Sequence, residues 1–346
     1  MPALGPGTIT MTLDLSIFVS LAFLFGIAAQ FRAADGYSFL RGIISALEGR
    51  LGLMYAVVIV AAVFSPFVLN DVLVLILTPV LVSYSKESGA DVAPLLVAEI
   101  TFTNIASSLT PLGNPQNILL WQASGISAGE FVAGTWLPLA ASGAVAALVL
   151  FAFRAKASSV RGATAKAGSW HPAAYLAASA AIVFSLNFAG VSNVVALGLA
   201  FALGFAFTFR SLKKLASEFD LRSLLILCAL VGVVALVASL IQPAIILYVS
   251  PAASGGQPYT AGFFGLMSAA ISNVPATQLV LSTTSVTPRA APILAVDAGL
   301  AGNIDPISSF ANLLALLMVA RSGLPIRRAV VLQLAIGLVA FLPAFL

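Results

Sequence analysis

The sequence predicts an all-α polytopic membrane protein with about eight spanning helices. It also predicts two inverted repeats, each with a re-entrant hairpin and an interrupted helix. Three observations lead to this fold class: the composition, two similar polar interruptions inside apolar segments, and the unequal charge of the loops. Hydrophobic residues make up 60% of the 346 residues and charged residues 8%, whereas about a quarter of the residues in a soluble domain are charged.

The composition also excludes several classes of protein. The net charge is +4, but the basic residues fall in short loops between apolar spans, so nucleic acid is not an expected partner. The single cysteine, Cys228, excludes an internal disulfide and a thiolate cluster. The single histidine, His171, excludes a pair of axial haem ligands. With no nucleotide-binding loop and no dense catalytic set, we expect neither an enzyme nor a cofactor, only a coupling ion.

Two polar interruptions resemble each other at a spacing of 195 residues. Residues 110–117 read TPLGNPQN and residues 305–312 read DPISSFAN, with proline, asparagine and a following leucine in register. A second polar break precedes each block, at Asn70-Asp71 and at Ser272-Asn273. Unpaired backbone groups in hydrocarbon cost several kcal/mol each, so such breaks persist only where they line a cavity or bind a ligand. Interrupted segments at corresponding positions of two halves indicate a transporter's binding site.

The apolar spans and the loop charges define a topology. A helix needs about 20 apolar residues to cross the bilayer, and eight segments meet this need: 13–31, 92–124, 130–153, 172–189, 191–209, 221–247, 289–320 and 327–345. Three loops are rich in Lys and Arg, whereas residues 248–260 carry no charge. The basic loops are therefore predicted to be cytoplasmic and the uncharged loop external.

Two apolar regions remain, 51–85 and 259–285. If either crossed the membrane once, the basic loops that follow would be external, so each region must leave the membrane on the side where it entered. After Asn70-Asp71 only 14 residues precede Lys86, which as helix is about 21 Å and too short to span. We therefore expect an inner re-entrant hairpin at 51–85, bounded by cytoplasmic loops, and an outer one at 259–285. The N-terminus is then external.

The predicted organisation has three parts. The first inverted repeat covers residues 1–153 and contains the interrupted helix 92–124. A cytoplasmic linker follows at 154–171, where Lys, Arg, Ala and Ser show no apolar period. The second inverted repeat covers 172–346 and contains the interrupted helix 289–320. The expected location is the inner (plasma) membrane, with several passes.

Two motifs resemble a known family. Residues 67–79 (FVLNDVLVLILTP) and 109–117 (LTPLGNPQN) resemble the ion transporter superfamily of the ArsB/NhaD type, which holds arsenite/antimonite permeases and sodium/proton antiporters. The sodium-coupled dicarboxylate and sulfate symporters are more distant members. The resemblance covers about residues 15–125 and 260–320. It implies that hairpin tips face unwound helix segments, that ions and substrate bind between them, and that the site moves as an elevator.

The candidate substrate- or ion-binding residues are the polar residues of the four breaks. They are Asn70, Asp71, Thr110, Gly113, Asn114, Asn117, Ser272, Asn273, Asn303, Asp305, Ser308, Ser309 and Asn312. Amide oxygens suit hard cations such as sodium, and amide NH2 groups can donate to an oxyanion or a hydroxyl.

Asp71 and Asp305 are the two acidic candidates. A carboxylate at bilayer depth costs roughly 2.5–3.5 kcal/mol and is a functional hypothesis by default; the alternative for Asp71 is a helix cap. One carboxylate per repeat suits two sodium ions or two protons. Glu99 and Asp297, on the helices that lead to the breaks, are candidates for a proton relay or for packing alone. Asn193, in a short external turn, is expected to have no role.

We therefore expect an ion-gradient-driven secondary transporter of a small inorganic oxygen-rich solute, with arsenite or antimonite efflux coupled to protons as the leading case. Sodium/proton antiport and sodium-coupled anion symport are the alternatives, although no Arg or Lys lies in the four breaks to neutralise a dicarboxylate. An intramembrane enzyme is the disfavoured rival class. Membrane lipid is an expected partner, a homodimer remains open, and the resemblance to arsenite permeases implies a partner ATPase as a further alternative.

Overall fold

The computed structural model describes residues 15–152, 171–208, 212–229, 232–233, 236, 258–283 and 285–345. Within these ranges every regular element is a helix, which confirms the predicted all-α class. Most of the predicted linker 154–171, the external loop 248–257 and much of the span 221–247 lie outside the described residues.

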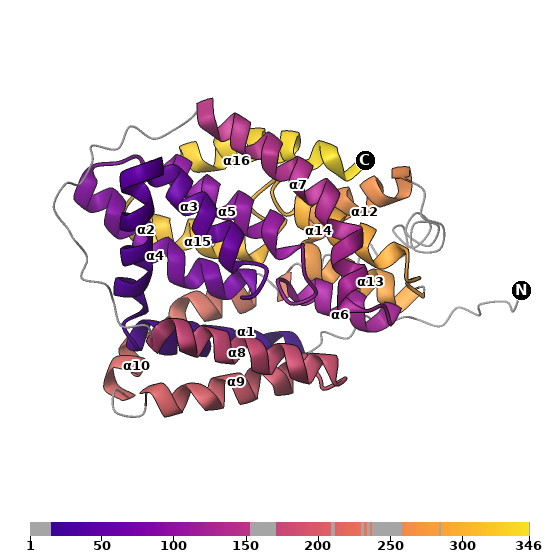
Figure 1. Cartoon of the computed structure of the whole chain (residues 1–346), viewed down its shortest axis with the longest axis horizontal. Helices are drawn as coiled ribbons and strands as arrows, with labels where there is room; N and C mark the ends of the chain where they lie inside the picture. Colours follow the sequence, from indigo (N-terminus) through magenta and orange to yellow (C-terminus); the bar gives the residue numbers. More distant parts are fainter. Residues whose placement is uncertain are drawn as a thin grey trace, which may run out of the picture.

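One layer of the fold consists of three helices, of which the first is far in the sequence from the other two (Figure 1). They are α1 (Leu15–Ala33), α8 (His171–Phe188) and α9 (Asn193–Thr208), and the short α10 (Leu212–Glu218) lies at one end of them. A buried amide holds the three together, because Gln30 Nε2 donates to Phe201 O (2.9 Å) and Tyr175 OH donates to Gln30 Oε1 (2.7 Å). We call α1, α8 and α9 the lower layer.

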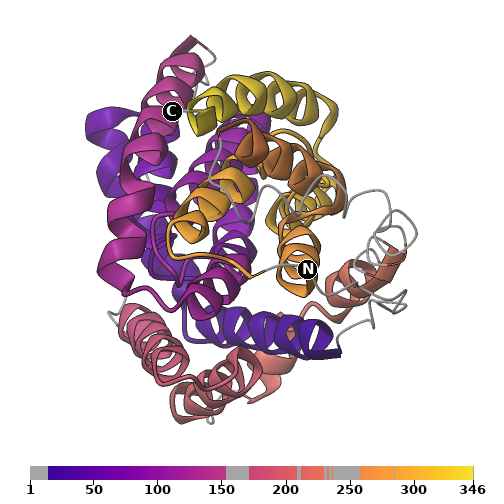
Figure 2. The ribbon, with the colours of Figure 1, turned by 90° about the vertical axis from the view of Figure 1, so that its right-hand side faces the viewer.

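The other helices form a larger body above the lower layer, and the view along the long axis shows the same division (Figure 2). Its first part contains α2 (Gly36–Leu51), α3 (Leu53–Phe64), α4 (Asn70–Ser88), α5 (Val92–Ser107), α6 (Pro115–Ser124) and α7 (Ala128–Ala152). We call α3 and α4 the first helix pair and residues 108–114, which separate α5 from α6, the first break. This break falls within 92–124, where the sequence analysis expects an interrupted helix.

The second part of the body repeats this order. It contains α12 (Pro258–Ile271), α13 (Asn273–Thr283), α14 (Ala290–Ala301), α15 (Phe310–Arg321), α16 (Arg327–Phe341) and the 3-10 helix η2 (Leu342–Phe345). α12 and α13 are the second helix pair, joined at Ser272, whose φ of 71° makes the sharp turn. Residues 302–309, between α14 and α15, are the second break, and they fall within 289–320, where the sequence analysis expects an interrupted helix.

Residues 36–51 form a helix that the sequence analysis did not assign. The chain bends by 74° between Phe18–Ala33 and Gly36–Leu51, and Asp35 at the bend has a φ of 70°. Among the described residues two helices, Ala128–Ala152 and Arg327–Ala344, are long and apolar enough to cross a membrane, or three spans exist if the bent pair counts as one. The count of eight spans and the inverted orientation of the halves stay predictions.

Four ion pairs occur among the described residues, and each joins segments that the predicted topology places on the cytoplasmic side. They are Arg32–Glu218, Arg41–Glu87, Arg321–Asp220 and Arg328–Asp91. The elements α2 and α10 mark this end of the molecule, at the left of Figure 1. The predicted cytoplasmic segments therefore lie close together, as the topology requires; the side of the membrane that they face stays a prediction.

Candidate functional site

The start of α4 contacts the first break. Asn70 N donates to Gly113 O (2.9 Å), and Thr110 Oγ1 donates to Pro66 O in the loop between α3 and α4. Gly113 is required here because a Cβ at this position would lie 2.0 Å from Ser107 O. The polar connection of the first helix pair and the polar interruption of the α5–α6 helix thus meet, as the resemblance implies.

The start of α13 contacts the second break in a similar way. The Asn273 amide is satisfied when its nitrogen donates to Ser308 O (2.7 Å) and Ala298 O (3.1 Å) and its oxygen accepts from Gln116 Nε2 (3.3 Å). This orientation is assigned from the hydrogen-bond network. Asn273 therefore links the second helix pair both to the second break and to α6 of the first part.

Asn117 and Asn312 make equivalent hydrogen bonds in the two breaks. Asn117 Nδ2 donates to Ser107 O (3.1 Å) and to Thr110 O (2.8 Å). Asn312 Nδ2 donates to Gly302 O (2.5 Å) and to the Asp305 carbonyl (3.0 Å). Asn312 and its two acceptor residues each lie 195 positions after Asn117 and the corresponding acceptor residues. Each asparagine thus donates to two carbonyls where its helix is interrupted, at equivalent positions of the two halves, which supports the predicted internal repeat.

Asn104 on α5 connects the two parts of the body, and the sequence analysis did not count it as a site residue. Its buried Nδ2 lies within hydrogen-bonding distance of Gly302 O (3.1 Å), Asn303 Oδ1 (3.1 Å) and Asn312 Oδ1 (2.9 Å). Its Oδ1 accepts from Asn70 Nδ2 (3.4 Å) and Ser309 Oγ (3.3 Å). The available signal was an asparagine inside an apolar helix, which is expensive in a membrane and marks a functional position.

We expect Asn104→Asp to destabilise the protein strongly, although the side chain keeps its shape. The substitution replaces an NH2 donor by an oxygen that faces three acceptors, and each buried acceptor left unpaired costs roughly 1–3 kcal/mol. Thermal unfolding in detergent measures the effect. An unchanged midpoint would show that Asn104 does not hold the second break in place.

Asp71 lies on a cavity of about 460 Å³ between the lower layer and the body. It is in the first turn of α4, where the helix dipole favours a negative charge, and no described residue donates a hydrogen bond to its carboxylate. The other lining residues are Ser16, Ser20, Leu21, Leu24, Pro115, Ile118, Leu119, Gln122, Ser192, Asn193, Val194, Val274, Gln278 and Phe310. None of them is basic, so the carboxylate has no fixed counter-ion there.

The cavity shows what the sequence analysis missed. Ser16 and Ser20 come from α1, Gln122 from α6 and Gln278 from α13, and only the tertiary fold brings these polar side chains together. Asn193, at the start of α9, was expected to have no role, but it lines the same cavity as Asp71. The expectation for Asn193 stays a prediction, although the fold places this residue at the cavity wall.

Asp305 has a local partner set that differs from that of Asp71. Its Oδ1 accepts hydrogen bonds from Ile307 N (2.7 Å) and Ser308 N (3.0 Å), and it is not among the residues that line the Asp71 cavity. The carboxylate therefore stabilises the turn of the second break. Cation binding at Asp305 stays a prediction.

Glu99 and Asp297, the two relay candidates, are completely buried outside that cavity. Glu99 Oε1 accepts from Thr78 Oγ1 (2.9 Å), while Glu99 Oε2 and both Asp297 carboxylate oxygens have no partner among the described residues. Buried carboxylates without partners are costly in the charged form. A relay role stays a prediction for both.

Two amide oxygens at the first break, one in it and one in the first turn of α6, also lack donors. Asn114 Oδ1 and Asn117 Oδ1 are buried and have no hydrogen-bond partner among the described residues, although the Nδ2 of Asn114 donates to Ser107 Oγ (2.6 Å). The equivalent oxygen of the second break, Asn312 Oδ1, is paired with Asn104. The first break therefore offers oxygen ligands that the second break has already used.

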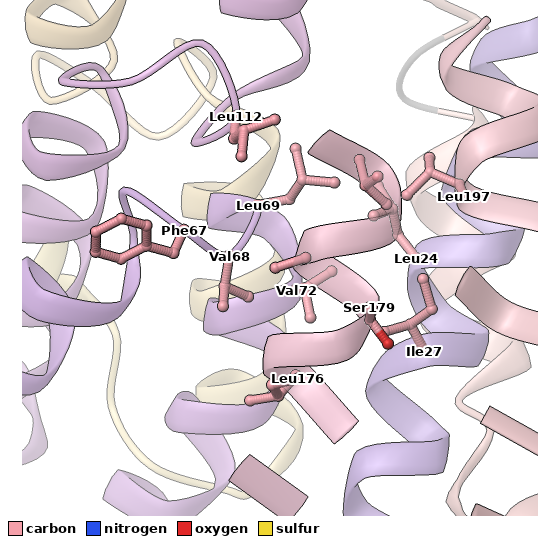
Figure 3. A pocket seen from close by; sticks show the side chains of 12 residues that line it. Leu24, Ile27, Phe67, Val68, Leu69, Val72, Leu112, Leu176, Ser179 and Leu197 are labelled. Carbon is pink, nitrogen blue, oxygen red and sulfur yellow. The ribbon is translucent and has the colours of Figure 1, made fainter. Parts of the chain in front are cut away.

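The boundary between the two layers is apolar beside the site (Figure 3). A small cavity of about 30 Å³ lies there, with Leu24, Ile27 and Leu176 on the lower layer. Val68, Leu69 and Val72, around the start of α4, face them. Apolar contacts are non-directional, so this boundary imposes no fixed register on the two layers.

An all-helical membrane protein with paired helix breaks and a cavity on a single carboxylate has the construction of a secondary transporter. Residues 1–298 match the model of the citrate transporter (CitMHS) family. The chain therefore belongs to this family, which confirms the resemblance to the ion transporter superfamily. The family and two of the three relatives below are named as transporters, not as enzymes.

Three curated relatives are similar over short stretches. The inner membrane protein YbiR of Escherichia coli is 40% identical over 88 residues, 25% of this chain and 23% of the relative. The silicon efflux transporter LSI3 of Oryza sativa subsp. japonica is 37% identical over 87 residues, 25% and 18% of the two chains. A transporter named arsB from Dictyostelium discoideum is 35% identical over 78 residues, 22% and 14%. The matched stretches span less than a quarter of these relatives.

Proposed function

We propose that this protein is an ion-gradient-driven secondary transporter that exports a small inorganic oxygen-rich solute, with arsenite or antimonite in exchange for protons as the leading case. The observation that carries the proposal is the Asp71 cavity, which contains one carboxylate among neutral hydroxyl and amide side chains and no basic residue. The helix breaks led to the expectation of a secondary transporter. The side chains that line the cavity indicate the chemical class of its solute.

The lining favours an uncharged hydroxylated solute over a polyanion. Ser20, Gln122 and Gln278 can donate to and accept from hydroxyl groups. A citrate-like anion would instead bring carboxylates beside Asp71 with no guanidinium or ammonium to offset the repulsion. Relatives named arsB and silicon efflux transporter fit the same preference, since both names refer to elements transported as small oxygen-rich solutes.

Asp71 supplies the coupling group in this proposal. A carboxylate that faces a cavity without a fixed counter-ion binds either a proton or a metal cation, and its occupancy changes the charge of the site. The unpaired oxygens of Asn114 and Asn117 are ligands of the kind sodium prefers. Sodium/proton antiport is therefore the second candidate, favoured by those two oxygens.

The transport cycle would move the site-bearing body against the lower layer. The site lies on the boundary of the two, and the boundary beside it is apolar (Figure 3), so sliding exchanges one set of non-directional contacts for another. Two inverted repeats with an inner and an outer re-entrant hairpin would open this site first to one side and then to the other. The proposed location is the inner membrane, with an external N-terminus.

Transport into proteoliposomes tests the proposal. Arsenite, antimonite, silicic acid, citrate and sodium are compared under imposed pH and sodium gradients. We expect uphill movement of a hydroxylated inorganic solute, driven by the pH gradient and independent of sodium. Citrate uptake that requires sodium would contradict the proposed substrate class, and sodium movement against a pH gradient without any solute would favour the antiporter.

The proposed topology predicts opposite labelling of two loop positions. In a Cys228→Ala background, Lys86→Cys should resist an impermeant external thiol reagent, because residues 86–91 are cytoplasmic. Gly129→Cys should react, because the start of α7 is external and a Cβ there meets nothing closer than 3.9 Å. External labelling of Lys86→Cys in intact cells would mean that the first helix pair crosses the membrane.

A further inference from the structure

Arg32 of α1 binds the middle of α4 through a carbonyl that the helix cannot pair itself. Pro79 lies inside α4 and has no N–H, so Leu75 O, four residues earlier, has no intrahelical donor. Arg32 Nη1 donates to this carbonyl (2.9 Å). The proline thus creates a docking point for a side chain from the lower layer.

The same guanidinium also binds α10. Arg32 Nε donates to Glu218 Oε2 (3.2 Å) and Nη2 donates to Glu218 O. Arg32 is only 4% exposed and its hydrogen bond to Leu75 O is buried, whereas the Glu218 side chain is 27% exposed, so losing the bond to Leu75 O is the costlier of the two. One buried side chain therefore joins the lower layer, the body and the segment at the predicted cytoplasmic end.

This connection lies next to the Asp71 cavity along both helices. Leu75 follows Asp71 by one turn of α4, about 6 Å along the helix axis, and Leu24 of α1, two turns before Arg32, lines the cavity. Between them the boundary consists of apolar side chains such as Ile27 and Val72 (Figure 3). The apolar contacts permit sliding, whereas the hydrogen bond to a backbone carbonyl fixes one register.

We infer that Arg32 is a positioning residue that locks α4 against α1 in one state of the transport cycle and so sets the Asp71 wall of the cavity against the α1 wall. The inference rests on the proposed function, because it requires the body to move. A displacement of α4 by one helical turn breaks the bond and leaves the guanidinium opposite apolar side chains. Release of Arg32 from Leu75 is then a required step of the cycle.

Pro79→Ala tests this without altering Arg32. The alanine restores an N–H that pairs with Leu75 O inside α4 and competes with Arg32 for this carbonyl, so the docking point is weakened while the ion pair with Glu218 remains. The register is measured by the yield of disulfide between Leu24→Cys and Val72→Cys in a Cys228→Ala background. We expect roughly a tenfold shift away from the cross-linkable state, the change produced by losing one charge-assisted hydrogen bond.

Arg32→Gln should also lower the yield of the Leu24→Cys/Val72→Cys disulfide. Arg32→Lys should retain part of the yield of the parent. The matched control is Arg41→Gln, which removes a half-exposed ion pair with Glu87 at the same end and should leave the yield unchanged. In transport, Pro79→Ala should raise the apparent KM and leave the maximal exchange rate at least as high as that of the parent, a split that loss of folded protein would not give.

The two failures are distinguishable. If the parent protein transports solute but the cross-link yield and the KM of Pro79→Ala equal those of the parent, Arg32 is not a positioning residue and the inference is overturned. If the parent transports none of the tested solutes, the proposed function fails and the inference falls with it.

Discussion

Asp71→Asn should abolish uphill transport while the protein stays folded. The amide keeps the shape of the carboxylate, but it does not take up a proton and carries no charge to attract a cation. Two unit charges 4 Å apart attract by about 4 kcal/mol at an effective dielectric constant of about 20, so we expect cation binding to weaken by at least roughly a hundredfold. Uptake against a gradient and exchange of pre-loaded solute are measured in parallel. Exchange of pre-loaded solute should continue, because it needs no net proton movement; full uphill transport would show that Asp71 is not the coupling group.

Asp305→Asn is the matched control for charge. An asparagine can still accept from Ile307 N and Ser308 N, the two amides that Asp305 pairs now. We therefore expect near-normal uphill transport and a small change in stability. Loss of coupling in this variant as well would support the second cation site that the sequence predicts at Asp305.

Asn117→Ala and Asn312→Ala should each lower thermal stability and raise the apparent KM together. Each substitution removes two hydrogen bonds to carbonyls at a break, and a buried group left unpaired costs roughly 1–3 kcal/mol. The breaks hold the helix starts that face the site, so a loosened break also weakens solute binding. The unfolding midpoint in detergent and the concentration dependence of uptake measure the two effects.

Gln30→Ala is the control that separates the loss of thermal stability from the rise in apparent KM. Gln30 is a buried amide of the lower layer with partners on α8 and α9, and it does not line the Asp71 cavity. Its replacement should lower stability and leave the apparent KM unchanged. If both asparagine variants transport like the parent, the matched breaks do not form the binding site.

The breaks could be predicted from the sequence because their signal is local. Proline, glycine and asparagine inside apolar segments have a high cost in a membrane, and the spacing of 195 residues linked Asn117 to Asn312 before their hydrogen bonds were known. The start of α4 at Asn70 followed from the same reasoning. At these positions the local residue types and the tertiary structure both require an interrupted helix.

The rest of the site depends on contacts between distant segments. Asn104 becomes central only because α14 and α15 bring their ends to it, and Gln278 becomes a cavity residue only because α13 lies opposite α1. The helix α2 was missed because Arg41, Glu48 and Arg50 interrupt its apolar pattern. Pro79 belongs to a motif that the sequence analysis identified. The carbonyl that this proline leaves unpaired, Leu75 O, binds Arg32, which is 43 residues away in the sequence and could not be predicted as its partner.

The central claim is that one cavity, on Asp71, opens in turn to the two sides of the membrane. The most direct test is the labelling of Gln278→Cys, on the α13 wall of that cavity, in a Cys228→Ala background. Impermeant thiol reagents are applied separately from each side of oriented vesicles, with and without an imposed pH gradient. We predict labelling from both sides, with the gradient increasing one rate and decreasing the other. Labelling from one side alone, at a rate that no gradient or solute changes, would contradict alternating access.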